Sequence, residues 1–231
     1  MATQLESDSK RPIRSYVIRA GRLTVSQRRA IDLYWQRYVI DYAAEPLQLD
    51  SVFSTNTKLI VEIGFGMGDS LLHMARQDPA SNFIGIDVHR PGVGKLLQGI
   101  AAHELGNLKI ICHDAKEVMQ HCFCAQSIDR LLILFPDPWP KKRHHKRRLV
   151  QSDFIALITK KLKAGAEVHL ATDWQAYAEQ MMEVMEATDE LTNQMGSAQY
   201  WQEPHRPQTK FERRGMRLGH GVWDLLFSKV G

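Results

Sequence analysis

The chain has 231 residues, of which 44% are apolar and 24% charged, and its formal net charge is +4. A chain of this length and composition can bury a full hydrophobic core, which excludes a wholly disordered protein. No apolar run approaches the roughly 20 residues of a membrane-spanning helix, and the polar first twelve residues indicate no secretory signal. Three cysteines are too few for a disulfide scaffold, so we expect a cytoplasmic protein that does not enter a membrane.

The first 25 residues carry five Lys or Arg between positions 10 and 22 but show little apolar periodicity. We interpret residues 1–25 as a flexible basic arm, which either clamps a nucleic-acid partner or is a disordered tail. From Ser26, a candidate N-cap, apolar residues recur at helical spacing through position 40. Residues 26–231 are expected to form a single domain.

From residue 59 onward, short apolar runs alternate with amphipathic segments. The runs predict strands at 59–63, 82–86, 108–112, 128–135 and 167–171. The segments between and after them predict helices at 69–77, 93–105, 115–122, 151–163 and 174–187. Two later segments, 209–213 and 222–228, look extended. The expected fold is α/β: a mostly parallel seven-stranded sheet with helices on both faces and an antiparallel C-terminal edge hairpin.

The first of these strands runs into the sequence Gly64-Phe65-Gly66-Met67-Gly68, and a predicted helix follows. Glycines at alternate positions let the main chain turn sharply and let a ligand lie against it, with free amides at the helix N-terminus. The spacing differs from the G-x-G-x-x-G of dinucleotide-binding folds, and no phosphate-binding lysine follows. A tight turn without a ligand remains the alternative for this loop alone.

Three carboxylates fall at the ends of neighbouring predicted strands, namely Glu62, Asp87 and Asp114. Open α/β sheets bind ligands at these carboxyl ends, where an acid after the second strand can accept hydrogen bonds from ribose hydroxyls. Asp114 would meet the exocyclic amine of an adenine, and Glu62 would favour an ammonium group. S-adenosylmethionine has a ribose, an adenine and an ammonium group but no pyrophosphate, so it is the ligand that this pattern favours.

The fourth strand ends in a proline-rich loop, residues 135–140, that contains Asp137 and Trp139. Three prolines in five residues make this loop stiff, and a carboxylate beside an aromatic ring suits a flat heterocycle. The sequence KKRHHKRR follows at residues 141–148, and since it carries six cations the rest of the chain is slightly acidic. A polyanion such as RNA is the natural partner of this run, with a solvated loop as the alternative.

The sequence PDPWPKKRHHKRR, together with EIGFGMG upstream and TKFE at 209–212, resembles the bacterial tRNA (guanine-N7)-methyltransferase family over nearly the whole chain. The resemblance implies a Rossmann-like class I methyltransferase fold with S-adenosylmethionine as cofactor. It also implies that the substrate is a guanine of tRNA, position 46 in the variable loop.

By this resemblance the cofactor-binding residues are Glu62, Gly64, Gly66, Gly68, Asp87, Asp114 and Asp137, and Asp137 is also the catalytic residue. The family commonly has Glu where this chain has Asp87. The implied substrate-binding residues are Lys141, Asp173, Thr209, Lys210, Phe211 and Glu212. The implied RNA-contacting residues are Arg143, His144, His145, Lys146, Arg147 and Arg148.

Guanine N7 has a free lone pair at neutral pH, so its methylation needs positioning rather than a general base. We therefore predict that Asp137 orients the guanine or the cofactor. Three alternatives stay open: methylation of an exocyclic amine, nicotinamide-dependent oxidoreduction, and tRNA binding without catalysis. Cys112, His113, His121, Cys122 and Cys124 lack the spacing of a structural zinc site, so we expect no metal. The sequence is compatible with a monomer or a homodimer.

Overall fold

The computed structural model describes residues 14–17, 22–55, 57–204, 206–207, 212 and 221–231. Within these residues, seven strands form one sheet with the order β3-β2-β1-β4-β5-β7-β6. The strands are β1 (Leu59–Ile63), β2 (Asn82–Ile86), β3 (Leu108–Ile111), β4 (Ile128–Leu134), β5 (Leu162–Thr172), β6 (Leu191–Asn193) and β7 (Trp223–Lys229). The first five strands are parallel and β7 is antiparallel to both of its neighbours, which confirms the predicted fold class.

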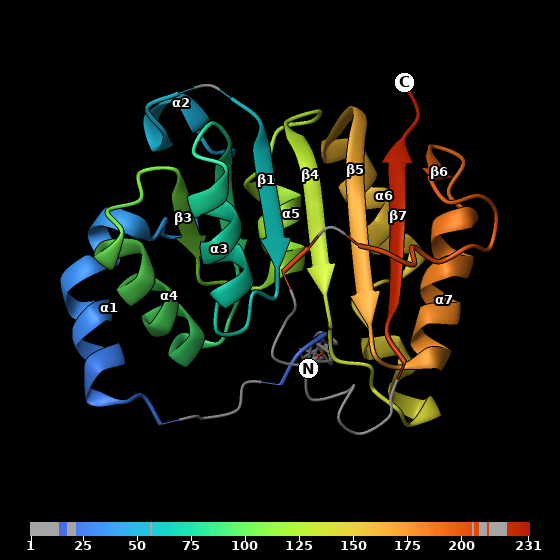
Figure 1. The fold of residues 1–231 in the computed structure, drawn as a ribbon, viewed down its shortest axis with the longest axis horizontal. Coiled ribbons are helices and arrows are strands. Elements are labelled where there is room, and N and C mark those ends of the chain that lie inside the picture. The colour runs from blue at the N-terminus through green and yellow to red at the C-terminus, as the bar shows by residue number, and fades with distance from the viewer. Residues whose placement is uncertain (1–13, 18–21, 56, 205, 208–211, 213–220) are drawn as a thin grey trace, which may run out of the picture.

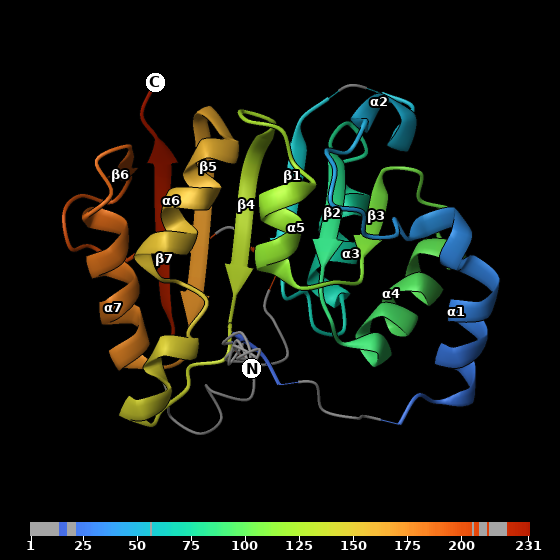
Figure 2. The same cartoon turned by 180° about the vertical axis from the view of Figure 1, so that it is seen from behind.

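Helices cover both faces of this sheet, as predicted (Figures 1 and 2). They are α1 (Val25–Tyr38), α2 (Leu49–Val52), α3 (Asp69–Gln77), α4 (Arg90–Ala102), α5 (Ala115–His121), α6 (Ser152–Lys161) and α7 (Gln175–Glu186), and a 3-10 helix, η1 (Lys142–Arg147), follows β4. Apolar side chains of α1, α3 and α4 pack into one core on β2 and β3, and those of α5, α6 and α7 into a second, larger core. The sheet is therefore buried on both faces, which explains the continuous apolar runs of its strands.

The first helix begins two residues earlier than the sequence predicts. Thr24, not Ser26, is the N-cap of α1, and its hydroxyl accepts a hydrogen bond from the Gln27 backbone N–H. The Gln27 side chain in turn accepts from the Thr24 backbone N–H, which completes a capping box. Thr24 and Ser26 are both residue types that cap helices, and the reciprocal hydrogen bonds with Gln27 select Thr24.

The C-terminal half of the sheet differs from prediction in two places. Strand β5 begins at Leu162, directly after α6, rather than at position 167, and Gly165 lies within it at a φ of +74°. The outer antiparallel strand is β6 at Leu191–Asn193, whereas we expected it at 209–213. Of that expected segment, only Glu212 is among the described residues. A strand of three residues has almost no periodicity of its own, and β6 exists because the edge of β7 offers it hydrogen bonds.

Candidate active site

The turn from β1 into α3, residues 64–68, is called the glycine loop here. Gly64, Gly66 and Gly68 have φ angles of +78°, +58° and +78°, in the left-handed region that residues with a Cβ atom rarely adopt. Gly68 is also the N-cap of α3, and a Cβ atom at this position would lie 2.9 Å from Leu96 in α4. The three glycines are thus required by the backbone conformation itself, and at Gly68 by the close approach of α4 as well.

Asp87, at the end of β2, is bonded to this loop. Its Oδ2 accepts a hydrogen bond from the Gly66 N–H at 2.8 Å, and its Oδ1 accepts one from the His89 N–H at 2.9 Å. Burial raises the pKa of Asp87 above its usual value, although both of these backbone hydrogen bonds lower it. A carboxylate has about four acceptor positions, so each oxygen can accept a second hydrogen bond from a ligand hydroxyl.

Glu62, the fourth residue of β1, is buried beneath the same loop. Burial, and to a smaller extent the nearby charge of Asp87, raises its pKa to about 8. Its Oε2 atom has no hydrogen-bond partner among the described residues. Burying a carboxyl oxygen without a hydrogen-bond partner costs free energy unless a ligand donates to it. This atom is therefore the strongest local indication of a position that binds a cationic group.

These groups line one cavity of about 700 Å³ at the carboxyl ends of β1, β2 and β4, the glycine-loop cavity. Six of the seven predicted cofactor-binding residues border it: Glu62, Gly64, Gly66, Gly68, Asp87 and Asp137. The seventh, Asp114, is not in the lining, although its neighbours His113 and Ala115 are. Asp114 caps α5 by accepting a hydrogen bond from the Lys116 N–H at 2.9 Å, and it also bonds the Tyr16 hydroxyl.

Sequence reasoning missed the residues that lie over the mouth of this cavity. Ser15 and Tyr16 belong to its lining, and the described segment 14–17 lies beneath the carboxyl ends of β1 and β4 in Figure 1. The Trp139 indole N–H donates a hydrogen bond to the Ser15 carbonyl oxygen at 3.0 Å. The Arg147 guanidinium lies 3.9 Å from the centre of the Trp139 ring and donates to the carbonyl oxygens of Arg14 and Tyr16. No periodicity or motif marks these partners, because they lie more than 120 residues apart in sequence.

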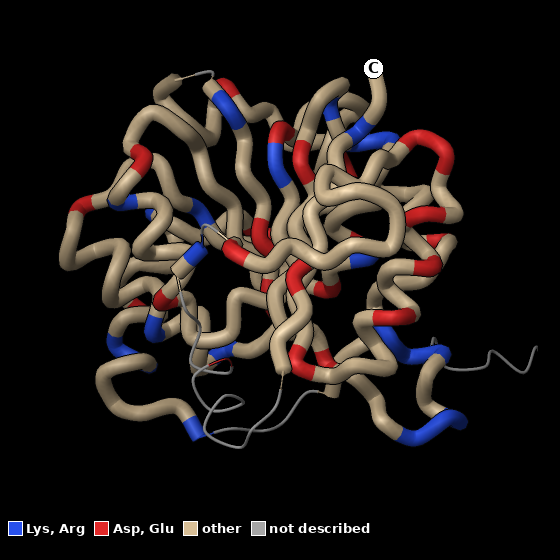
Figure 3. The backbone as a smooth tube through the Cα atoms, turned by 45° about the vertical axis from the view of Figure 1, so that its right-hand side comes forward, with Lys and Arg blue, Asp and Glu red and all other residues tan. Residues whose placement is uncertain are grey.

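Residues 141–148, the basic loop, follow Asp137 and include η1. Figure 3 shows this loop as a run of Lys and Arg at the lower right of that view. The side chains of Lys141, Lys142, Arg143 and Lys146 are exposed. The pKa of His144 is lowered, first by its partial desolvation and then by the surrounding cations, so it adds no charge at neutral pH. The exposed members form a surface suited to a polyanion.

Arg148, the last member of the run, is different. It is 2% exposed, and its guanidinium donates hydrogen bonds to the carbonyl oxygens of Pro138 and Ala176 and to the Gln180 side chain. It also lies 4.7 Å from the centre of the Tyr177 ring. This burial contradicts the expectation that Arg148 contacts RNA, since its donors are used within the protein to fix the proline-rich loop on α7.

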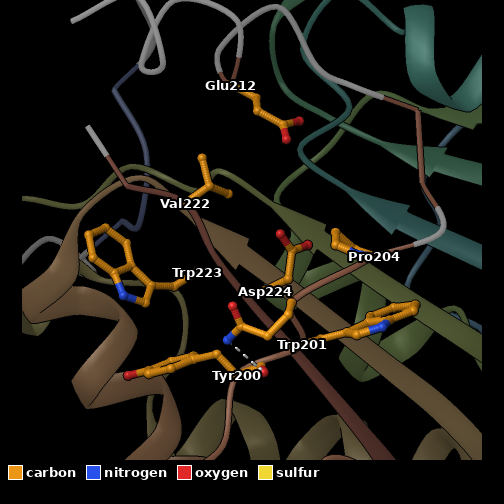
Figure 4. A pocket seen from close by; sticks show the side chains of 8 residues that line it. Tyr200, Trp201, Pro204, Glu212, Val222, Trp223 and Asp224 are labelled. Carbon is orange, nitrogen blue, oxygen red and sulfur yellow. Dashed lines mark hydrogen bonds between the residues drawn. The ribbon is translucent and has the colours of Figure 1, made fainter. Parts of the chain in front are cut away.

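Two of the remaining predicted substrate residues, Asp173 and Glu212, line other cavities than the glycine-loop cavity. Asp173 borders a separate cavity of about 400 Å³, and Glu212 borders one of about 230 Å³ among Tyr200, Trp201 and Trp223 (Figure 4). We call the latter the aromatic cavity. Thr209, Lys210 and Phe211 lie outside the described residues.

The described part of the chain holds no group of three His, Cys, Asp or Glu side chains that could bind a metal ion. His113 instead stacks on the Tyr42 ring and bonds Glu117, and Cys122 is buried. None of its helices is both long enough and apolar enough to span a membrane.

Comparison with known proteins decides the family. Residues 56–225 match a family model described as "Putative methyltransferase". A tRNA (guanine-N(7)-)-methyltransferase of Pseudomonas aeruginosa PAO1 is 50% identical over 229 residues, which cover 97% of this chain and 94% of that protein. The enzyme of the same name from Neisseria meningitidis is 50% identical over 98% of this chain and 94% of its own length. This chain belongs to the tRNA (guanine-N7)-methyltransferase family.

Solved structures agree with the fold of this methyltransferase. A 16S rRNA methyltransferase, KamB, matches with a TM-score of 0.58 and 16% identity over 80% of this chain and 93% of its own. A 16S rRNA (adenine(1408)-N(1))-methyltransferase from Catenulisporales acidiphilia matches with a TM-score of 0.55 and 15% identity, covering 79% and 90% of the two chains. At this identity the likeness concerns the fold, which is that of the class I methyltransferases.

Proposed function

We propose that this protein transfers a methyl group from S-adenosylmethionine to N7 of a guanine in tRNA, at position 46 of the variable loop. Family membership supports the reaction, and the position in tRNA rests on the family resemblance of the sequence. The observation that carries the proposal is Asp137, which borders the glycine-loop cavity four residues before the exposed cations of the basic loop. A base placed at Asp137 would thus have its flanking phosphates beside Lys and Arg side chains.

The residues of the cavity fit this cofactor. When bound, S-adenosylmethionine supplies an electrophilic methyl group on a sulfonium centre. Glu62 presents a carboxyl oxygen without a partner in the described part of the chain, which suits the ammonium group, and Asp87 has acceptor positions for ribose hydroxyls. The glycine loop leaves no side chain at Gly64 or Gly66 to obstruct the ligand. Asp114 remains our prediction for the adenine edge, together with Tyr16, which bonds it.

The protein's own groups then need only to position the guanine. Because N7 carries a free lone pair, no side chain has to remove a proton before the methyl transfer. The task is to bring the two reacting atoms to about 3–3.5 Å in line, and orientation of this kind can supply a large part of a rate enhancement. We assign this orienting role to Asp137, with Asp173 and Glu212 as further acceptors for the donor groups of guanine.

The remaining expectations concern the macromolecular partner. We propose that Lys141, Arg143 and Lys146 contact tRNA phosphates, with His144, His145 and Arg147 beside them on the same loop. We also propose that residues 1–25 act as a basic arm on a single methyltransferase domain, residues 26–231. The protein would work in the cytoplasm, where tRNA is found, as a monomer or a homodimer.

The proposal is tested by incubating the purified protein with methyl-labelled S-adenosylmethionine and unmodified tRNA transcripts, followed by nucleoside mass spectrometry. Formation of 7-methylguanosine is the expected result, and a transcript with adenosine at position 46 should accept no label. A different methylated nucleoside, such as an exocyclic methylamine, would overturn the choice of target atom. Binding of tRNA without any methylation would overturn the enzymatic function.

A further inference from the structure

A buried network of charged side chains lies between the glycine-loop cavity and the aromatic cavity. Arg206 is at its centre, with a side chain that is 2% exposed. Its Nε and Nη2 atoms donate to the two carboxylate oxygens of Asp224 at 2.7 and 2.8 Å, and its Nη1 donates to Glu212 Oε2 at 2.6 Å. This fork geometry fixes both carboxylates in distance and in orientation, which a point charge could not do.

Asp224 anchors the network to the sheet. It lies in β7, opposite Ala171 of β5, and its Oδ1 also accepts a hydrogen bond at 2.7 Å from His169, which is fully buried in β5. Burial alone would raise the pKa of Asp224, but the hydrogen bonds from Arg206 and His169 outweigh it and hold the pKa below its usual value. The carboxylate is therefore charged, and it ties Arg206 to the middle of an ordered sheet.

The same guanidinium reaches the wall of the glycine-loop cavity. It lies 5.3 Å from the centre of the Phe135 ring, and both Phe135 and Pro207 belong to the lining of that cavity. In Figure 1 the orange-red segment after β6 crosses in front of β7, β5 and β4. Phe135 is two residues before Asp137, so Arg206 connects the cofactor side of the site with Glu212.

Figure 4 shows the other side of the connection. The carboxyl groups of Glu212 and Asp224 point toward each other across the aromatic cavity, and Arg206 bonds both. We infer that Arg206 is a positioning residue of the methyltransferase: it holds Glu212 at a fixed distance from the glycine-loop cavity, with Asp224 as its anchor. This inference rests on the proposed function, in which Glu212 accepts a hydrogen bond from the target guanine.

The test begins with Arg206→Lys, which keeps the charge but removes the fork. The kcat for tRNA methylation should fall roughly 30-fold, because a misplacement of about 1 Å at a contact can cost up to 100-fold in rate. The Kd values for S-adenosylmethionine and for tRNA should each change less than about threefold, since Arg206 is in neither binding surface. Arg130→Lys is the matched control, because Arg130 of β4 also pairs with a carboxylate, that of Glu167, at 3.3 Å. The kcat of this variant should stay within about twofold of the wild-type value.

A double-mutant cycle separates positioning from a general structural role. If Arg206 acts through Glu212, Arg206→Lys combined with Glu212→Gln should be no slower than Glu212→Gln alone. Multiplying effects would overturn the inference, as would a Glu212→Gln protein with wild-type kcat. Should Arg206→Lys unfold more than 5 °C below the wild type, the single variant Glu212→Asp, which shortens the same contact from the other side, is measured instead. A fall in kcat with both Kd values within threefold of the wild type would support the inference, and a wild-type kcat would overturn it. Failure of the proposed function is seen separately, as a wild-type protein that forms no 7-methylguanosine.

Discussion

The glycine-loop cavity and the basic loop lie side by side, yet different kinds of interaction hold them. Main-chain geometry builds the cavity: left-handed glycines, strand ends, and a carboxylate bonded to two backbone N–H groups. Side chains from distant segments hold the basic loop, with Arg148 against α7 and Arg147 against residues 14–16. The first region is therefore built mainly by the ends of neighbouring parallel strands and the turn that follows β1, whereas the second depends on side chains from distant segments.

The largest effect is expected inside the basic run itself. Arg148→Ala should lower the free energy of unfolding by about 3 kcal/mol, because it leaves buried carbonyl oxygens without donors. Thermal unfolding should show a midpoint roughly 6–12 °C lower. Arg143→Ala, at an exposed member of the same run, should leave the midpoint unchanged but reduce the salt dependence of tRNA binding by about one phosphate contact. If the Arg148→Ala protein has wild-type stability but binds tRNA more weakly, Arg148 contacts RNA and the prediction is wrong.

The second prediction concerns the point where the two regions meet. Asp137→Asn should lower kcat/KM for tRNA about 100-fold, because the amide cannot accept from guanine donors at both of its terminal atoms. If Asp137 only orients, the shape of the pH–rate profile should be the same for the wild type and the variant. The measurement is kcat/KM from pH 6 to 9 for both proteins. An acidic limb present in the wild type and absent in the variant would show that Asp137 acts as a base.

The third prediction uses the raised pKa of Glu62. Below its pKa of about 8 the carboxyl holds a proton, which it must lose to pair with a cationic ligand. The affinity for S-adenosylmethionine should therefore rise with pH up to about 8, by at most about tenfold per unit, and level off above it. The side chain of the Glu62→Gln protein does not titrate, so any remaining pH dependence of its affinity comes from titration of S-adenosylmethionine itself. Calorimetry at pH 6.5, 7.5 and 8.5 gives both curves, and parallel curves would contradict the prediction.

The smallest expected effect is a difference between two glycines of one loop. Gly64→Ala and Gly68→Ala both place a Cβ atom at a φ of +78°, which costs about 1–2 kcal/mol in either case. At Gly64 the new atom meets nothing within 4 Å, whereas at Gly68 it lies 2.9 Å from Leu96. Urea denaturation should thus find Gly68→Ala less stable than Gly64→Ala by about 1 kcal/mol. Equal stabilities would mean that α4 moves aside without cost.

The sequence by itself determined the sheet from β1 to β4, because each strand there is a short apolar run followed by a helix of ordinary length. It also identified the glycine loop with Glu62 and Asp87, since carboxyl ends of adjacent parallel strands must meet at one edge. These features are local or follow from topology, so a linear pattern carries them. The resemblance to the family added the substrate, which no spacing of residues could have supplied.

Only the tertiary structure decided which charged residues face solvent and which hold the protein together. All residues of the run 141–148 are basic, but Lys142 is exposed whereas Arg148 is buried. Similarly, Arg206 and Asp224 are 18 positions apart, and nothing in either neighbourhood marks them as partners. The strand β6 was misplaced for the same reason, since its hydrogen bonds come from β7, more than 30 residues later. Such contacts are chosen by the packed fold, where desolvation makes a buried charge persist only beside its partner.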